Sequence, residues 1–346
     1  MNLLESQGYS FLCDYIHLTF LIGVMVSYLY FRKYRVSIGG TLAVGYLAAS
    51  LYAPLNSLVT VLVSMFAFVL IRFVVLKLFL PRPRQIFAIG LAIGVICGLA
   101  WLGLSEFLFY RTKEQYGLAL VGVIVPGMIT NSLNKQGLKK TLLPMLWMVP
   151  LAGAVGWALT YVTVKWLNIS ISDQLFDASI ERLPLVFALS ATSVLMALII
   201  QEQTVRTFKL RTGGYVTVGF LWAAAVANTW YLLILGLSVA AVYLIYHAYE
   251  ARVPLFGKDR FVVLIFTSFA VTITIEYIFS LVEGAKLAGP QNIVLCVLPA
   301  IIANDLIQYG FKRTGGGMGI SLVGTSLVAA PPRRVPVKGR RDRGGR

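Results

Sequence analysis

Charged residues are scarce in this sequence, and acidic residues are the scarcest of them. Only 13% of the 346 residues are charged, with 14 Asp or Glu against 30 Lys or Arg, and there are 2 His. The 3 cysteines, Cys13, Cys97 and Cys296, are odd in number and lie in or beside apolar segments, which favours core packing over disulfides. No nucleotide-binding loop, metal-ligand cluster or nucleophile arrangement is present, so we expect no metal, no cofactor and no independent enzymatic activity.

Apolar residues dominate instead, at 58% of the chain. Several apolar runs reach the roughly 18–20 residues needed to cross a bilayer, and no hydrophilic block is long enough for a soluble domain. Such runs become helices because hydrocarbon offers no partner to an unpaired backbone N–H or C=O. The sequence therefore predicts an all-α polytopic membrane protein with about 11–12 transmembrane helices.

The expected spans fall into two halves separated by an acidic linker. In the first half they cover about 11–30, 38–53, 57–80, 86–104, 118–133 and 141–162. In the second half they cover about 183–200, 215–227, 230–246, 261–281 and 291–306, followed by a shorter segment at 315–330.

One stretch of the first half recurs in the second. Residues 125–141 read VPGMITNSLNKQGLKKT, and residues 298–314 read LPAIIANDLIQYGFKRT. The identical pairs are Pro126/Pro299, Ile129/Ile302, Asn131/Asn304, Leu133/Leu306, Gly137/Gly310, Lys139/Lys312 and Thr141/Thr314. Shared hydrophobicity would explain the Leu and Ile matches but not Pro, Asn, Gly, Lys and Thr in one register.

A second landmark repeats at nearly the same offset along the chain. Gly39, Gly40 and Gly45, expected to serve helix packing, are matched in the second half by Gly213, Gly214 and Gly219. Two landmarks at nearly one offset indicate an internal duplication. We therefore divide the chain into a first membrane repeat (1–166), an extracytoplasmic linker (167–182), a second membrane repeat (183–330) and a basic C-terminal tail (331–346).

The distribution of basic residues predicts the topology. Short basic stretches at 32–35, 82–84, 206–211 and 258–260 belong on the cytoplasmic side by the positive-inside rule, which leaves the acidic linker outside. Six spans per repeat is an even number, so both repeats share one orientation and are related by an axis along the membrane normal. The side of the tail depends on whether 315–330 crosses the membrane, and we favour a cytoplasmic tail.

The motif residues resemble a known family. Gly45-Tyr46-Leu47 and the stretch Val125–Leu138 are similar to the PgsC/CapC family. This resemblance implies a membrane subunit of the bacterial plasma-membrane machinery that makes poly-γ-glutamate and capsule. It also implies an ATP-dependent amide-ligase-type synthetase among its partner subunits, and no nucleic acid. Since a typical member is about as long as one repeat, the chain looks like two subunits fused, although Ala300 replaces Gly127 in the second copy.

The same motif supplies candidate site residues. A Pro-Gly pair inside a span is expected to unwind the backbone, and the following Asn and Lys would then meet an anionic chain. The predicted substrate-binding residues are Pro126, Asn131, Gly137, Lys139, Thr141, Pro299, Asn304, Gly310, Lys312 and Thr314, with Glu106 and Glu276 as acidic candidates inside or beside their spans. The alternative is helix packing, with Pro and Gly as kinks and Asn in an interhelical hydrogen bond.

Three functions remain open from the sequence. The first is a subunit of a poly-γ-glutamate or related polymer complex that anchors the synthetase and guides polymer across the membrane. The second is a stand-alone secondary transporter for a small carboxylate. The third is a scaffold with no conduction path.

Overall fold

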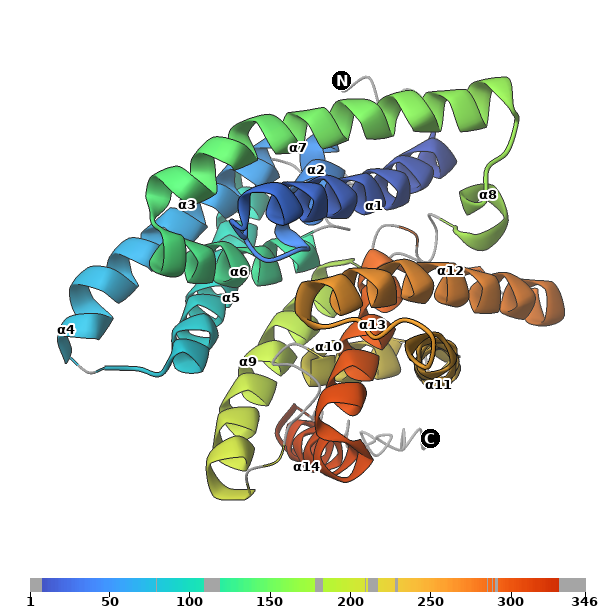
Figure 1. Ribbon diagram of the computed structural model, residues 1–346. Coiled ribbons are helices and arrows are strands. Elements are labelled where there is room, and N and C mark those ends of the chain that lie inside the picture. Colours follow the sequence, from blue (N-terminus) through green and yellow to red (C-terminus); the bar gives the residue numbers. More distant parts are fainter. Residues whose placement is uncertain are drawn as a thin grey trace, which may run out of the picture.

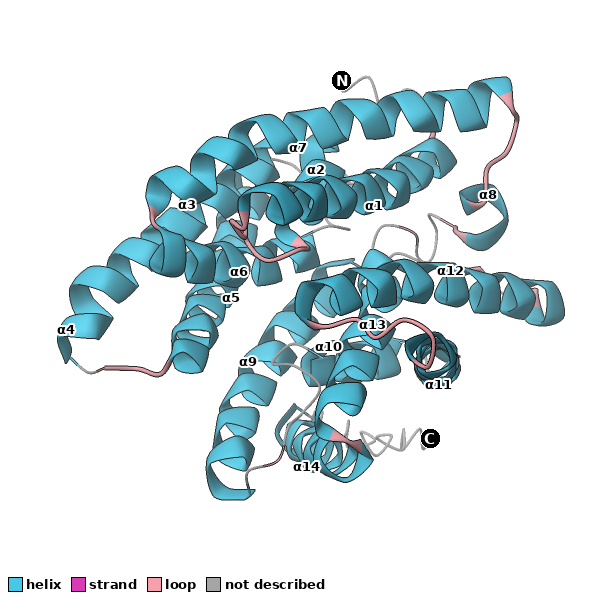
Figure 2. Ribbon diagram, viewed as in Figure 1, coloured by secondary structure: helices cyan, strands magenta, loops and turns pink. Residues whose placement is uncertain are grey.

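The computed structural model describes residues 8–78, 80–108, 119–177, 183–208, 210, 217–227, 230–284, 286–287, 289 and 292–329. Within these residues the regular structure is helical, apart from one isolated bridge between Phe176 and Leu287 (Figure 2). In the part of the chain that the structure describes, six helical segments are long and apolar enough to cross a bilayer: Tyr9–Tyr34, Pro54–Leu78, Leu138–Trp166, Trp230–Glu250, Gly257–Glu283 and Asn292–Tyr309. The prediction of an all-α polytopic membrane protein is confirmed.

The first repeat contains six helical units. They are α1 (Tyr9–Tyr34), α2 (Ala43–Ala49) extended by the 3₁₀-helix η2 (Ser50–Tyr52), α3 (Pro54–Leu70) continued by the π-helix η3 (Ile71–Val75) and α4 (Leu76–Leu78), α5 (Pro83–Leu108), α6 (Ala119–Gln136), and α7 (Leu138–Tyr161) extended by the π-helix η5 (Val162–Trp166). The short helix α8 (Ser172–Leu175) lies in the linker.

The second repeat contains the same six units in the same order. They are α9 (Leu183–Phe208), α10 (Thr217–Ala227), α11 (Trp230–Glu250), α12 (Gly257–Glu283), α13 (Asn292–Tyr309) and α14 (Phe311–Ala329). The offset between the starts of paired helices stays nearly constant, from the pair α1 and α9 to the pair α7 and α14. The short final segment of the sequence is thus the counterpart of α7.

The repeats also share their internal packing. Helix α1 packs on α2 and α7, and α9 packs on α10 and α14. Helix α6 packs on α3 and α5, and α13 packs on α11 and α12. Close approach of small residues recurs as well: a Cβ on Gly45 would lie 2.7 Å from the Phe20 carbonyl oxygen, and a Cβ on Gly219 would lie 2.7 Å from Val194 Cα. Val194 follows Phe20 at the same offset at which Gly219 follows Gly45, so the same helix crossing is built twice.

Equivalent hydrogen bonds join the repeats to each other. Tyr28 Oη on α1 donates to Asp259 Oδ1 on α12 at 2.9 Å, and Gln85 Nε2 on α5 donates to Glu202 Oε1 on α9 at 3.1 Å. Tyr28 and Glu202 occupy equivalent positions, as do Gln85 and Asp259. An interface in which the same two patches exchange contacts is isologous, which is the signature of two-fold symmetry. Figure 1 shows the first repeat in blue to green and the second in yellow to red, with α1 and α12 facing each other.

Both motif helices run in the same direction. Gln136 at the end of α6 accepts a hydrogen bond from the backbone N–H of Ser37, just beyond the end of α1. Near the end of α13, Asn304 accepts from Arg260, whose neighbour Asp259 binds Tyr28 in the last two turns of α1. Helices α6 and α13 therefore end at one face of the bundle, and the repeats are parallel.

We call this face, with Arg32–Arg35 and the first turn of α12, the basic end. The opposite face, with linker residues 168–177, is the linker end. There the Asp14 carboxylate near the start of α1 accepts hydrogen bonds at 2.6 Å from the hydroxyls of both Ser170 and Ser172. The linker is thereby tied to the first repeat.

The second predicted span differs from expectation. Its first part is not helical, and α2 begins only at Ala43. Gly39 and Gly40 have φ of 62° and 75°, in the left-handed region that an α-helix cannot contain. The segment 36–42 nevertheless lies inside the protein, because Ile38 is 1% exposed and Ser27 Oγ donates to the Gly40 carbonyl at 3.5 Å. Irregular backbone of this kind is tolerated at membrane depth only where protein or a cavity surrounds it.

Candidate functional site

The repeated motif folds into a helix–glycine–helix corner in both copies. Gly137 ends α6 and Gly310 ends α13, with φ of 82° and 81°, and the next helix starts at the following residue. The N–H of each glycine donates to the carbonyl four residues earlier, Leu133 or Leu306, at 2.9 Å. The identical Gly and Leu pairs of the sequence therefore serve one backbone geometry.

The motif threonines stabilise the same corner. Thr141 is fully buried and its hydroxyl donates to the Gly137 carbonyl at 3.0 Å. Thr314 is fully buried too, and its hydroxyl donates to the Asp305 carbonyl at 3.2 Å. One hydroxyl therefore bonds the carbonyl of the corner glycine, and the other bonds a carbonyl in the last turns of α13.

The motif prolines do not open the backbone. Helices α6 and α13 continue through Pro126 and Pro299, both of which are buried. The expected unwinding is wrong here, because a proline removes only one helical hydrogen bond and the neighbouring helices hold the rest of the helix in place. Gly127 serves close packing instead: a Cβ there would lie 2.9 Å from Leu91 Cα on α5. The unwound backbone of this repeat is the segment before α2.

That unwound segment borders a pocket between the two repeats. The pocket has a volume of about 650 Å³ and lies at the basic end. The first repeat supplies the segment before α2 and one residue of α6, and the second supplies the start of α12 and the last turns of α13. The lining residues are Gly40, Thr41, Leu42, Met128, Phe256, Gly257, Lys258, Arg260, Phe261, Asn304 and Gln308.

The pocket is positively charged. Among the described residues, its lining has two basic side chains, Lys258 and Arg260, and no Asp or Glu. The Lys258 ammonium lies 3.6 Å from the centroid of the Phe31 ring, a cation–π contact with an uncharged partner.

One motif residue, Asn304, orients the guanidinium in the pocket. Arg260 Nε donates to Asn304 Oδ1 at 3.1 Å, and both side chains are partly buried. This bond uses one of the five guanidinium donors, and the asparagine NH₂ is not part of it. The arrangement suits a carboxylate, because a guanidinium fork can bind both carboxylate oxygens at once.

Other predicted residues lie elsewhere. Lys139 and Lys312 are exposed in the first turns of α7 and α14 and do not line the pocket. Asn131 is partly buried at the equivalent position of α6. The segment that would face it in the second repeat, with Gly213 and Gly214, lies outside the described residues, as does the side chain of Glu106.

Lys258 and Arg260 were not among the predicted site residues. In the sequence they read as one of several basic stretches that mark the cytoplasmic side. The sequence around Lys258 and Arg260 does not indicate that the first turn of α12 contacts the unwound segment of the other repeat. The only signal for them was their position in a basic stretch adjoining a span of the repeat that carries Asn304.

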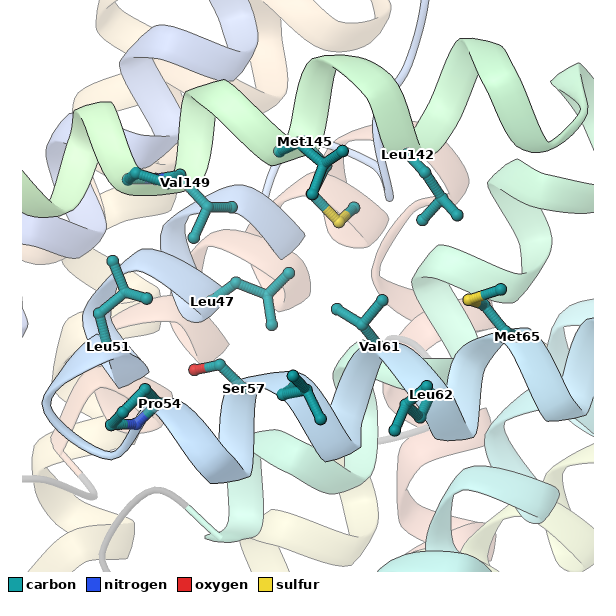
Figure 3. A pocket seen from close by; sticks show the side chains of 13 residues that line it. Leu47, Leu51, Pro54, Ser57, Val61, Leu62, Met65, Leu142, Met145 and Val149 are labelled. Atoms are coloured by element: carbon teal, nitrogen blue, oxygen red, sulfur yellow. The ribbon is translucent and has the colours of Figure 1, made fainter.

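A second pocket has no chemistry for an anion. It lies between α2, α3 and α7 and has a volume of about 440 Å³ (Figure 3). Its lining is apolar except for Ser57, whose hydroxyl donates to the Ser50 carbonyl at 3.1 Å. Leu58 and Leu62, which also line it, are more than half exposed, as expected for side chains that face lipid.

The fold and the pocket define a class: a multi-pass helical membrane protein made of two parallel tandem repeats, with a basic pocket between them. Comparison with known families agrees. The sequence model of the family described as "Capsule biosynthesis CapC" matches residues 22–142 and again residues 196–315. The chain therefore belongs to the CapC family, and each repeat carries one copy of the family sequence.

Curated relatives are single-repeat proteins by comparison. The chain is 29% identical over 126 residues to "PGA biosynthesis protein CapC" of Bacillus subtilis (strain 168), covering 36% of this chain and 83% of the relative. It is 27% identical over 127 residues to "Capsule biosynthesis protein CapC" of Bacillus anthracis, covering 37% and 83%. No solved structure matches. The family places the chain in capsule biosynthesis.

Proposed function

We propose that this chain is the bacterial plasma-membrane subunit of a poly-γ-glutamate, or related anionic polymer, synthesis and export complex. In this role it anchors an ATP-dependent amide-ligase-type synthetase, and its own contribution is to bind and guide polymer rather than to catalyse. The observation that carries the proposal is the pocket between the repeats, in which Lys258, Arg260 and Asn304 converge and whose described lining contains no Asp or Glu.

The position of the pocket supports a path for the polymer. Polymer made by a synthetase on the cytoplasmic face would meet the basic end first, and the exposed Lys139 and Lys312 lie at that end outside the pocket. A polyanion would then reach Arg260 and Lys258 at the mouth between the repeats. The unwound segment around Gly40 would offer backbone groups to the polymer as it passes.

Binding of poly-γ-glutamate to the purified chain tests this role. The double variant Lys258→Gln/Arg260→Gln should lose at least about tenfold in affinity, since a hydrogen bond to a charged group contributes about 1.5–3 kcal/mol. The control is Arg206→Gln/Arg252→Gln, which removes the same charge from exposed positions. In cells that depend on this chain for polymer export, the pocket variant should stop polymer release and the control should not. Equal affinity and equal release from the two doubles would refute the role of the pocket.

A transporter of small carboxylates would use the same pocket differently. Proteoliposomes that contain only this chain separate the two functions. Uptake of radiolabelled glutamate by the chain alone would favour the transporter, whereas polymer release that needs the synthetase favours the subunit. If neither activity occurs and the pocket variants behave as wild type, the chain acts as a scaffold.

A further inference from the structure

A second polar site lies deep in the second repeat, away from the basic pocket. Glu276 on α12 and Asn292, the first residue of α13, are both 0% exposed. Asn292 Nδ2 donates to Glu276 Oε2 at 2.7 Å. Thr272, one helical turn before Glu276 on the same face of α12, is 1% exposed. The stretch of α13 from Asn292 to Asn304 places this site about 18 Å along the helix from the pocket, at about 1.5 Å per residue.

Three oxygen atoms in this group lack partners. Among the residues that the structure describes, Glu276 Oε1, Asn292 Oδ1 and Thr272 Oγ1 are buried and form no hydrogen bond. No described lysine or arginine forms an ion pair with the Glu276 carboxyl group. Buried oxygens are rarely left unpaired, because each loses its water without compensation. Three unpaired oxygen atoms on the two packed helices α12 and α13 indicate that a ligand binds between them.

The site is closed from the linker end. Phe176 of the linker stacks on His17 with ring centroids 5.4 Å apart, and His17 meets Phe269 of α12 at 6.2 Å. The backbone at Leu287 pairs with the linker at Phe176, and the N–H of Gly289 donates to Tyr9 Oη at 3.1 Å. These contacts cover the ends of α12 and α13, so an occupant must be small.

We propose that Thr272, Glu276 and Asn292 bind one small monovalent cation, either Na⁺ or a proton. An all-oxygen donor set suits a hard cation, and a single carboxylate balances a single positive charge. Ionisable groups in membrane spans commonly mark ion and proton pathways. The sequence counterparts in the first repeat, Gly98, Leu102 and Ala119, carry no side-chain oxygen, so those positions cannot form an equivalent site.

Titratable groups on the elements that pack against α12 and α13 must be considered in any pH experiment. They include Cys296 on α13, Cys13, Asp14 and His17 on α1, Tyr231 on α11 and Asp173 on α8. All of them remain in a Glu276→Gln variant. The difference between wild type and that variant therefore isolates the contribution of Glu276.

Thermal unfolding of the purified full chain in detergent tests the site. One arm titrates NaCl against choline chloride at constant ionic strength and pH 8. If Na⁺ is the ligand, saturating NaCl raises the Tm of the wild type by about 3 °C or more, and Glu276→Gln and Thr272→Val lose this rise. Glu283→Gln, an exposed acid at the end of the same helix, should keep it.

A second arm varies the pH in choline chloride alone. If a proton is the ligand, NaCl has no effect, and the Tm of the wild type falls as pH rises from 6 to 9 while that of Glu276→Gln stays flat by comparison. If Glu276→Gln does not fold, Thr272→Val and direct ²²Na⁺ binding to the wild type decide between the two ligands. Identical responses of wild type, Glu276→Gln and Thr272→Val to both NaCl and pH would overturn the assignment.

Discussion

Close packing of α2 on α1 and of α10 on α9 makes a sharp prediction about two glycines. An added Cβ on Gly45 would lie 2.7 Å from the Phe20 carbonyl oxygen, and one on Gly219 would lie 2.7 Å from Val194 Cα. Real Cβ atoms essentially never approach other atoms below 3.0 Å. The obstacles are backbone atoms, which cannot rotate away as a flexible side chain can. Each Gly→Ala change must therefore push two helices apart.

The size of the effect follows from two opposing terms. In a helix interior, Ala is favoured over Gly by about 0.8–1.0 kcal/mol when nothing is nearby. Overpacking of a well-packed core costs about 1–3 kcal/mol. Gly236 in α11 has nothing within 4 Å of an added Cβ, so only the first term applies there. We expect Gly236→Ala to stabilise the protein and Gly45→Ala and Gly219→Ala to destabilise it by about 1–2 kcal/mol net.

Thermal or denaturant unfolding in detergent micelles measures this difference. A change of about 1.4 kcal/mol is tenfold in the ratio of folded to unfolded protein, well within the resolution of the assay. Because Gly45 and Gly219 occupy equivalent crossings, their variants should behave alike. If Gly45→Ala were as stable as Gly236→Ala, the close approach of α1 and α2 would be refuted.

Two further predictions follow from the corner and from the topology. Gly137→Ala and Gly310→Ala should each destabilise the protein by about 1–3 kcal/mol, because the backbone at Gly137, with φ of 82° and ψ of 170°, lies in a region accessible essentially only to glycine. Equal unfolding curves for the variants and the wild type would contradict the corner geometry. The topology is tested in a chain with Cys13, Cys97 and Cys296 replaced. An impermeant thiol reagent applied to sealed cells should label Asn168→Cys and not Arg206→Cys, both of which are at exposed positions. Labelling of Arg206→Cys alone would show the opposite orientation in the membrane.

The duplication could be read from the sequence without the structure. The offset between the two motif copies is close to the offset between the paired helices, and the identical Gly137 and Gly310 occupy the same corner. Such features are local. A left-handed glycine between two apolar runs ends one helix and starts the next, whatever surrounds it. Apolar run length likewise determined the class of the protein, since a bilayer permits few other structures.

The unwound segment before α2 was not foreseen, because Gly39 and Gly40 are equally compatible with tight helix packing and with a break. The buried surroundings of Ile38 and Gly40 decide between the two. The opposite error concerned Pro126 and Pro299. Local chemistry predicted a break in the helix at each proline, but both helices continue. Packing of α6 against α3 and α5, and of α13 against α11 and α12, maintains them.

The two polar sites depend on the tertiary structure alone. Arg260 meets Asn304 from another helix, and the pocket also needs Gly40, which belongs to the other repeat and is distant in the sequence. Glu276 could be suspected from its place in a span, but only the packing of α12 on α13 supplies Asn292 as its partner. Helical periodicity states which face of a helix is apolar and nothing about which helix it will face. Which helices face each other is determined by the two-fold interface, in which α1 contacts α12 and α9 contacts α5. When these matching surfaces of the two repeats are buried against each other, their polar residues are brought together.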